Sequence, residues 1–216
     1  MTRAYSFSAA GGHGSSVNEN DYTGRNRSHL VNEDAFVLQP LPDGGWLVAL
    51  ADGQGGRAGG RRAAQLACEV AARGGLAEDA DAAVAADPAA GFTTLVVLRV
   101  EGGRVTGASC GDSAAVAVCG GDAPRVLTSR QFKNPPVGSG EATFMPFEAE
   151  LVRPWRVLAM TDGVWKYIGW QRIHELAAKA QPATEPAAPA EPPAAAEPIA
   201  ADVPAAPALA NEPQAP

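Results

Sequence analysis

The sequence predicts a mixed α+β fold in which helices lie outside antiparallel β-sheets. Most of the chain consists of short apolar segments separated by glycine-rich turns, which is typical of consecutive hairpins. Two longer stretches, 60–73 and 165–178, have helical composition instead. From residue 181 onward the composition changes to Ala, Pro and Glu, so we expect the folded part to end there.

The strands are predicted from three pairs of apolar segments. Each pair flanks a turn that contains Gly beside Asp or Glu, and Pro42-Asp43-Gly44-Gly45 has the clearest turn chemistry. A later apolar segment, 156–161, begins just after Pro154 and predicts one more strand. The three pairs are, in chain order, 35–39 with 46–51, 93–100 with 104–110, and 114–119 with 125–127.

The helices are predicted from composition and spacing. The stretch 60–73 is rich in Ala, Leu and Arg. In the stretch 165–178, Ile168, Ile173 and Leu176 are spaced so that they could share one face.

The composition predicts one soluble domain over 1–180 and a disordered tail over 181–216. The whole chain is 46% hydrophobic and 19% charged, which is ordinary for a domain with its own core. The tail holds ten of the eighteen prolines and no aromatic residue, so it cannot bury enough apolar surface to fold.

The charge and the apolar segments limit the partners and the location. The formal net charge of -7 does not favour binding to nucleic acid or to an anionic membrane surface. No stretch approaches the ~18 consecutive apolar residues that a membrane span needs. We therefore expect a cytoplasmic protein without a membrane or nucleic-acid partner.

Four acidic motifs lie at the ends of predicted strands. A single Asp-Gly after a strand is usually only a turn. Four such motifs together indicate a site for a hard cation such as Mg²⁺ or Mn²⁺, because these ions bind several oxygen ligands from different elements. The motifs are Asn32-Glu33-Asp34, Ala51-Asp52-Gly53, Gly111-Asp112-Ser113 and Thr161-Asp162-Gly163.

Five motifs occur in the order found in the PPM (type 2C) family of metal-dependent serine/threonine phosphatases, which the body of this chain resembles. They are Asn32-Glu33-Asp34-Ala35, Ala51-Asp52-Gly53-Gln54-Gly55-Gly56, Gly91-Phe92-Thr93-Thr94-Leu95, Cys110-Gly111-Asp112-Ser113 and Met160-Thr161-Asp162-Gly163-Val164-Trp165. The resemblance implies a sandwich of two antiparallel β-sheets flanked by helices, with two divalent cations, Mn²⁺ or Mg²⁺, bound between the sheets.

The resemblance also implies roles for single residues. Asp52 and Asp162 are the catalytic metal ligands, and Asp52 bridges both ions. The Gly53 carbonyl binds one ion, and Glu33 acts mainly through water. Asp34 supports this end of the site, and Asp112 matches a position that helps to hold a further, weaker metal.

The implied activity is hydrolysis of phosphoserine and phosphothreonine in proteins by a metal-activated water. The expected partner is a phosphoprotein substrate, such as a bacterial serine/threonine kinase or one of its targets. A compact bacterial enzyme that acts as a monomer is expected.

The sequence departs from the family pattern at four places, which leaves an alternative open. The phosphate-binding arginine is replaced by His29, although Arg27 or Arg25 could reach the phosphate instead. Gln54 stands where many family members have a histidine, and Lys166 stands where they commonly have an aspartate. A final strand with its aspartate is missing, because Asp202 lies in the tail. The alternative is a weak or inactive pseudophosphatase that binds phosphoproteins.

Two further patterns have more than one interpretation. The run 53–58 fits G-x-G-x-x-A, a dinucleotide-binding signature, but hairpins rather than βαβ units follow it. The loop 133–140, which is rich in Pro and Gly, is either an ordinary connection or a flap over the site.

Overall fold

The structure, a computed structural model, describes residues 32–54, 59–120 and 122–179. Over these residues the chain forms two antiparallel β-sheets flanked by helices, so the predicted fold class is confirmed. The predicted tail, 181–216, and the predicted site residues His29 and Arg27 lie outside the described residues.

The larger sheet has the strand order β1-β2-β3-β4-β7, and the smaller sheet has the order β6-β5-β8. All pairs of neighbouring strands in the two sheets are antiparallel. The strands are β1 Asp34–Pro40, β2 Trp46–Asp52, β3 Leu95–Glu101, β4 Arg104–Cys110, β5 Ala114–Cys119, β6 Arg125–Val126, β7 Met145–Glu150 and β8 Trp155–Met160. The helices are α1 Gly60–Ala72, α2 Ala77–Ala86, α3 Asp162–Ile168 and α4 Trp170–Lys179.

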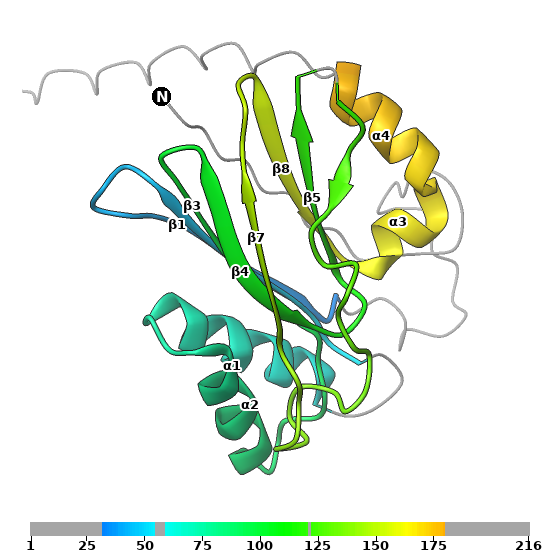
Figure 1. The fold of residues 1–216 in the computed structure, drawn as a ribbon. Coiled ribbons are helices and arrows are strands. Elements are labelled where there is room, and N and C mark those ends of the chain that lie inside the picture. The colour runs from blue at the N-terminus through cyan, green and yellow to red at the C-terminus, as the bar shows by residue number, and fades with distance from the viewer. Residues whose placement is uncertain (1–31, 55–58, 121, 180–216) are drawn as a thin grey trace, which may run out of the picture. The chain divides into compact units, whose positions relative to one another are not determined.

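The elements form four layers, with the two sheets in the middle (Figure 1). Helices α1 and α2 cover the outer face of the larger sheet, where five small α1 residues are buried against β2 and β3. Helix α4 covers the smaller sheet through Ile173 and Ala177. A further cluster of buried apolar side chains, called the central cluster, lies between the two sheets.

Strand β3 shows how one segment serves two layers, because both of its faces are buried. Leu95 and Val97 point toward α1 and α2, whereas Val96, Leu98 and Val100 point between the sheets. A strand that is buried on both faces has a continuous apolar sequence rather than an alternating one. Burial on both faces therefore explains the continuous apolar run from 95 to 98.

The three predicted hairpins are confirmed, with boundaries that differ by one or two residues. In the first, Pro40 pairs with Trp46, and the Leu41 amide donates to the Gly45 carbonyl at 2.9 Å to close the turn. Strand β7 and helix α2 were not predicted. Strand β7 has the sequence MPFEAE, whose Pro and two Glu residues are poor strand signals, and it lies at the sheet edge where they are tolerated.

The single helix predicted over 165–178 is wrong. Helix α3 begins at Asp162 and ends before Gly169, whose φ of 81° favours glycine, and α4 begins at Trp170. Of the three apolar residues expected to share a face, only Ile173 is buried, whereas Ile168 and Leu176 are each 46% exposed.

The dinucleotide-binding interpretation does not fit this topology. Strand β2 is followed by α1 and α2, but it then pairs antiparallel with β3, whereas that motif requires a parallel βαβ unit. Among the described residues, no helix has the length and apolar character needed to cross a membrane.

We expect Leu98→Ala to lower the free energy of unfolding by about 2–5 kcal/mol, because it leaves a cavity between the sheets. Leu98 is 1% exposed in the central cluster. Urea denaturation followed by circular dichroism measures the change. Val152→Ala is the control, since Val152 is 68% exposed. Equal stability of the two variants would contradict the packing described here.

Candidate functional site

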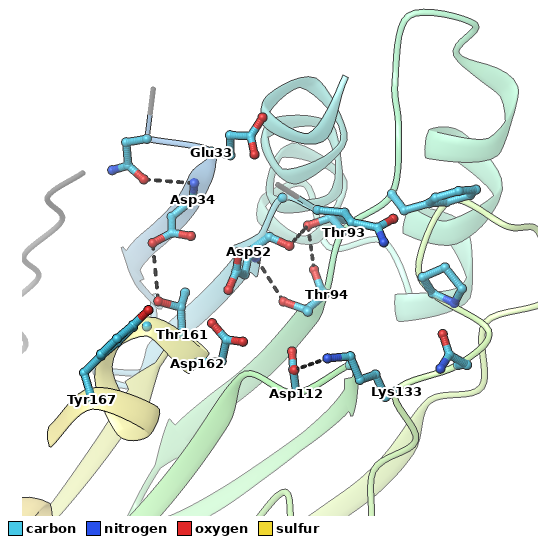
Figure 2. Close-up of a pocket in the computed structure, with 18 residues that line it drawn as sticks. Glu33, Asp34, Asp52, Thr93, Thr94, Asp112, Lys133, Thr161, Asp162 and Tyr167 are labelled. Carbon is cyan, nitrogen blue, oxygen red and sulfur yellow. Dashed lines mark hydrogen bonds and ion pairs between the residues drawn. The ribbon is translucent and has the colours of Figure 1, made fainter. Parts of the chain in front are cut away.

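The predicted acidic residues meet in one cavity of about 520 Å³ at an end of the sandwich. We call it the acidic pocket. Asp34 begins β1, Asp52 ends β2, Asp112 follows β4, and Asp162 follows β8 as the first residue of α3. Figure 2 shows these side chains on separate elements around one space, with Glu33 at the edge.

Asp34 and Asp52 lie directly opposite each other across the β1–β2 ladder. Burial raises the pKa of Asp52 to about 8, and the neighbouring charges of Asp34 and Asp162 add to this effect. Burial also raises the pKa of Asp34, although hydrogen bonds with Asp52 and Thr161 oppose the shift. The pair therefore holds a proton near neutral pH when no cation is bound.

Two threonines before β3 fix the backbone of Asp52. The Asp52 amide donates to Thr94 Oγ1 at 3.0 Å, and the Asp52 carbonyl accepts from Thr93 Oγ1 at 2.9 Å and from the Thr94 amide at 3.0 Å. Thr94 Oγ1 lies 2.7 Å from Ser113 Oγ, which links this end of β2 to the segment after Asp112. The Asp52 carboxylate is thus placed by a rigid backbone.

Asp34 is held from two sides. Its amide donates to Asn32 Oδ1 at 3.0 Å, and Thr161 Oγ1 donates to its Oδ2 at 3.3 Å. Thr161 precedes α3, but its hydroxyl makes no capping bond to the helix. The Thr161 hydroxyl instead joins the end of β8 to the start of β1, as the dashed line in Figure 2 shows.

Gly53 lies where no side chain fits. A Cβ atom at this position would come within 2.5 Å of the Gly60 backbone and 2.8 Å of the Glu33 carbonyl. The Gly53 amide donates to that carbonyl at 3.3 Å, so Glu33 and Gly53 lie side by side. Burial, and then the Asp34 charge, raises the pKa of Glu33.

Two lysines neutralise the other side of the pocket. Lys166 Nζ bonds Asp162, and it also lies 3.3 Å from Asp112 Oδ2. Lys133 Nζ lies 2.6 Å from the same Asp112 oxygen. Burial alone would raise the pKa of Asp112, but the two ammonium groups hold it below its usual range. The Asp162 bond is the main reason that the Lys166 pKa is raised.

Several residues of the site were not predicted. Thr93, Thr94 and Thr161 lie inside the recognised motifs, but their sequence gives no sign that they orient Asp52 and Asp34. Lys133 lies in the loop 133–140, which does line the acidic pocket through Lys133, Asn134 and Pro136. The sequence signal that could have identified Lys133 as a site residue is a lysine in a loop near the acidic motifs.

The donor set suits a hard divalent cation in its chemistry, but the side chains are not assembled around one. The pocket offers four aspartates and one glutamate, the oxygen ligands that Mg²⁺ and Mn²⁺ prefer. In the described part of the chain, no three acidic, His or Cys side chains lie close enough together to hold an ion as they stand. Burial and the neighbouring carboxylates nevertheless raise the pKa of Asp52 to about 8, and a bound cation would relieve this repulsion.

We expect Asp52→Asn to stabilise the protein in chelator, by at least about 3 °C in melting temperature at pH 8. The folded-state pKa of Asp52 is raised, so the folded state binds the proton more tightly than the unfolded chain, and stability falls as pH rises from about 4 to about 8. The gain over the wild type should therefore grow from pH 5 to pH 8.

Thermal melts across this pH range measure the difference. Asp122→Asn is the control, because Asp122 is exposed outside the acidic pocket. A melting difference that stays constant from pH 5 to pH 8 would contradict the buried, charge-coupled position of Asp52.

Comparisons with known proteins agree with this architecture. A family model described as protein phosphatase 2C matches residues 23–74, which include β1, β2 and α1. No curated protein matches the chain significantly.

Several solved bacterial structures share the fold. The serine/threonine phosphatase Stp1 from Staphylococcus aureus has a TM-score of 0.59 and 18% identity, over 74% of this chain and 82% of that one. PppA from Pseudomonas aeruginosa has a TM-score of 0.54 and 21% identity, over 70% and 80%. RsbX, solved in complex with magnesium, has a TM-score of 0.57 and 13% identity, over 70% and 74%. The chain therefore has the fold of the PPM-type phosphatases, and the resemblance drawn from its five motifs is confirmed.

Proposed function

We propose that this chain hydrolyses phosphoserine and phosphothreonine in proteins with the help of two divalent cations, Mn²⁺ or Mg²⁺. The observation that carries the proposal is the convergence of Asp34, Asp52, Asp112 and Asp162 from separate elements in one open pocket. The match to the protein phosphatase 2C model and the shared fold support the same reaction class. A phosphoprotein partner, a monomeric state and a cytoplasmic location belong to this proposal.

The chain's own residues prepare the site. Hydrogen bonds with Thr93 and Thr94 fix the Asp52 backbone beside the pocket, and the Thr161 hydroxyl donates to the Asp34 carboxylate. Asp162 stands across from both on the first turn of α3. Because the backbone is fixed, the carboxylates could close on a cation by side-chain rotation alone.

Asp52, Asp162 and the Gly53 carbonyl would hold the two ions, with Glu33 and Asp34 in support and Asp112 at a weaker position. The ions, when bound, supply a water of lowered pKa and neutralise charge on the phosphoryl oxygens. His29 and Arg27 stay in the proposal as phosphate-contacting residues, although the structure does not describe them.

A second candidate is a pseudophosphatase that binds phosphoproteins without hydrolysing them. One observation favours it: Lys166 already places a cation between Asp112 and Asp162. An ammonium in this position opposes a second cation by charge repulsion. Metal-dependent turnover separates the two candidates.

Asp52→Asn and Asp162→Asn should each lower turnover at least about a hundredfold, because each removes an anionic ligand from the proposed metal site. Release of phosphate from p-nitrophenyl phosphate and from a phosphothreonine peptide, titrated with Mn²⁺ and then with chelator, measures it. Asp122→Asn is the matched control. Full activity in either pocket variant would rule out the assigned roles, and no metal-dependent turnover in folded wild type would favour the pseudophosphatase.

Lys166→Gln should tighten Mn²⁺ binding by about three- to tenfold, because it removes a cation that competes for Asp162 and Asp112. Isothermal titration calorimetry of the chelator-treated protein measures this without turnover. Lys179→Gln is the control, since Lys179 is exposed at the end of α4. Unchanged or weaker binding would show that Lys166 does not compete with the metal.

A further inference from the structure

The loop between β6 and β7 is fixed beside the acidic pocket at several points. At its first half, the Gly111 amide donates to the Phe132 carbonyl at 2.8 Å, and Gln131 Nε2 donates to the Ser113 carbonyl at 2.7 Å. These bonds place Lys133 next to the segment that carries Asp112. Figure 2 shows the Lys133 side chain reaching Asp112 from the loop.

The second half of the loop is fixed to the strand segment that orients Asp52. Thr93 and Val137 exchange two backbone hydrogen bonds, of 3.0 and 3.1 Å, and Val137 is fully buried. Thr93 also donates its hydroxyl to the Asp52 carbonyl. The position of the loop and the position of Asp52 are therefore coupled through one residue.

A buried carboxylate on α2 holds this half of the loop. Asp81 is 5% exposed, and its Oδ1 accepts from the amides of Gly138 and Gly140 at 2.6 and 3.2 Å. Its Oδ2 accepts from the Ala142 amide at 3.0 Å. Positive φ angles of 101° at Gly138 and 77° at Gly140 turn both amides toward the same oxygen. Charge-assisted bonds of this kind are stronger than neutral ones.

Lys133 carries an exposed side chain on this fixed loop. Its side chain is 66% exposed, whereas that of Asp112 is 20% exposed. Because the Lys133 ammonium lies largely in water, solvent screening weakens its ion pair with Asp112, and an incoming anion can compete with Asp112 for it. Asp112 would keep Lys166 as its partner after the exchange.

We propose that Lys133 binds the phosphate dianion of the substrate and that Asp81 is a positioning residue that holds the Lys133 loop in place. This inference rests on the proposed function for its substrate class, phosphate monoesters. It gives the pocket an anion-binding group within the described residues, supplied by a loop rather than by the strands that carry the aspartates.

The test compares wild type, Lys133→Met, Lys133→Arg and Lys179→Met in kinetics with both phosphate substrates and in calorimetric binding of inorganic phosphate with Mn²⁺ present. Lys133→Met should raise KM and the phosphate dissociation constant about five- to twentyfold, and kcat should fall by less than KM rises. Lys133→Arg should restore most of the loss, and the Lys179→Met control should match the wild type. Wild-type values for Lys133→Met would overturn the inference.

Asp81 is tested through Asp81→Asn, which can keep the bonds to Gly138 and Gly140 but turns an NH₂ group toward the Ala142 amide. It should raise KM about three- to tenfold in the wild type and less than twofold in the Lys133→Met background. An equal effect in both backgrounds would show that Asp81 acts only on stability.

The calorimetric measurement of phosphate binding distinguishes this inference from the proposed function. Phosphate binding that depends on Lys133 without any turnover would support Lys133 and overturn the phosphatase. Turnover together with phosphate binding that does not depend on Lys133 would support the phosphatase and overturn the Lys133 assignment. A wild type that binds no phosphate would overturn the Lys133 assignment.

Discussion

The site depends on one cross-strand pair, Asp34 opposite Asp52 at the open end of the β1–β2 ladder. Like charges directly opposite each other destabilise a sheet, so this pair lowers the stability of the hairpin that contains it. The register that creates it is set at the other end, where the turn after β1 brings Pro40 opposite Trp46. A slip of one residue would turn the side chains of the slipped strand to the other face and separate the two aspartates. The tight turn therefore fixes the register that places Asp34 opposite Asp52 in the acidic pocket.

The surrounding elements are arranged so that this pair can persist. Thr93 and Thr94 anchor the Asp52 backbone, and Thr161 donates to the Asp34 carboxylate, so neither group can shift without losing a hydrogen bond. Helix α1 begins directly against Gly53, where a Cβ atom would collide with Gly60. Close packing at this point leaves the ends of β1 and β2 no freedom to spread apart.

Sequence reasoning located the hairpins and the acidic motifs because both are local signals. A turn such as Asp43-Gly44 and an Asp-Gly at a strand end are visible within a few residues. It failed where tertiary contacts decide. The single helix predicted over 165–178 is interrupted at Gly169, where α3 ends. Asp81 and Gly138 lie 57 positions apart, and only the packing of α2 beside the loop brings them together. The ion pair of Lys133 with Asp112 likewise depends on how the loop after β6 packs.

The negative charge of the pocket is balanced in two different ways, and the difference has a functional consequence. Near Asp52 the balance is a proton, since burial raises the pKa of that carboxyl to about 8. Near Asp112 and Asp162 it is the ammonium groups of Lys133 and Lys166. A divalent cation entering the first region must displace a proton, so its apparent affinity increases with pH. A cation entering the second must compete with Lys166, which pairs with Asp162 and Asp112 and whose pKa is raised by the Asp162 bond. The two halves of the pocket therefore differ in how cation binding responds to pH, because a cation near Asp52 must displace a proton and a cation near Lys166 must displace an ammonium group.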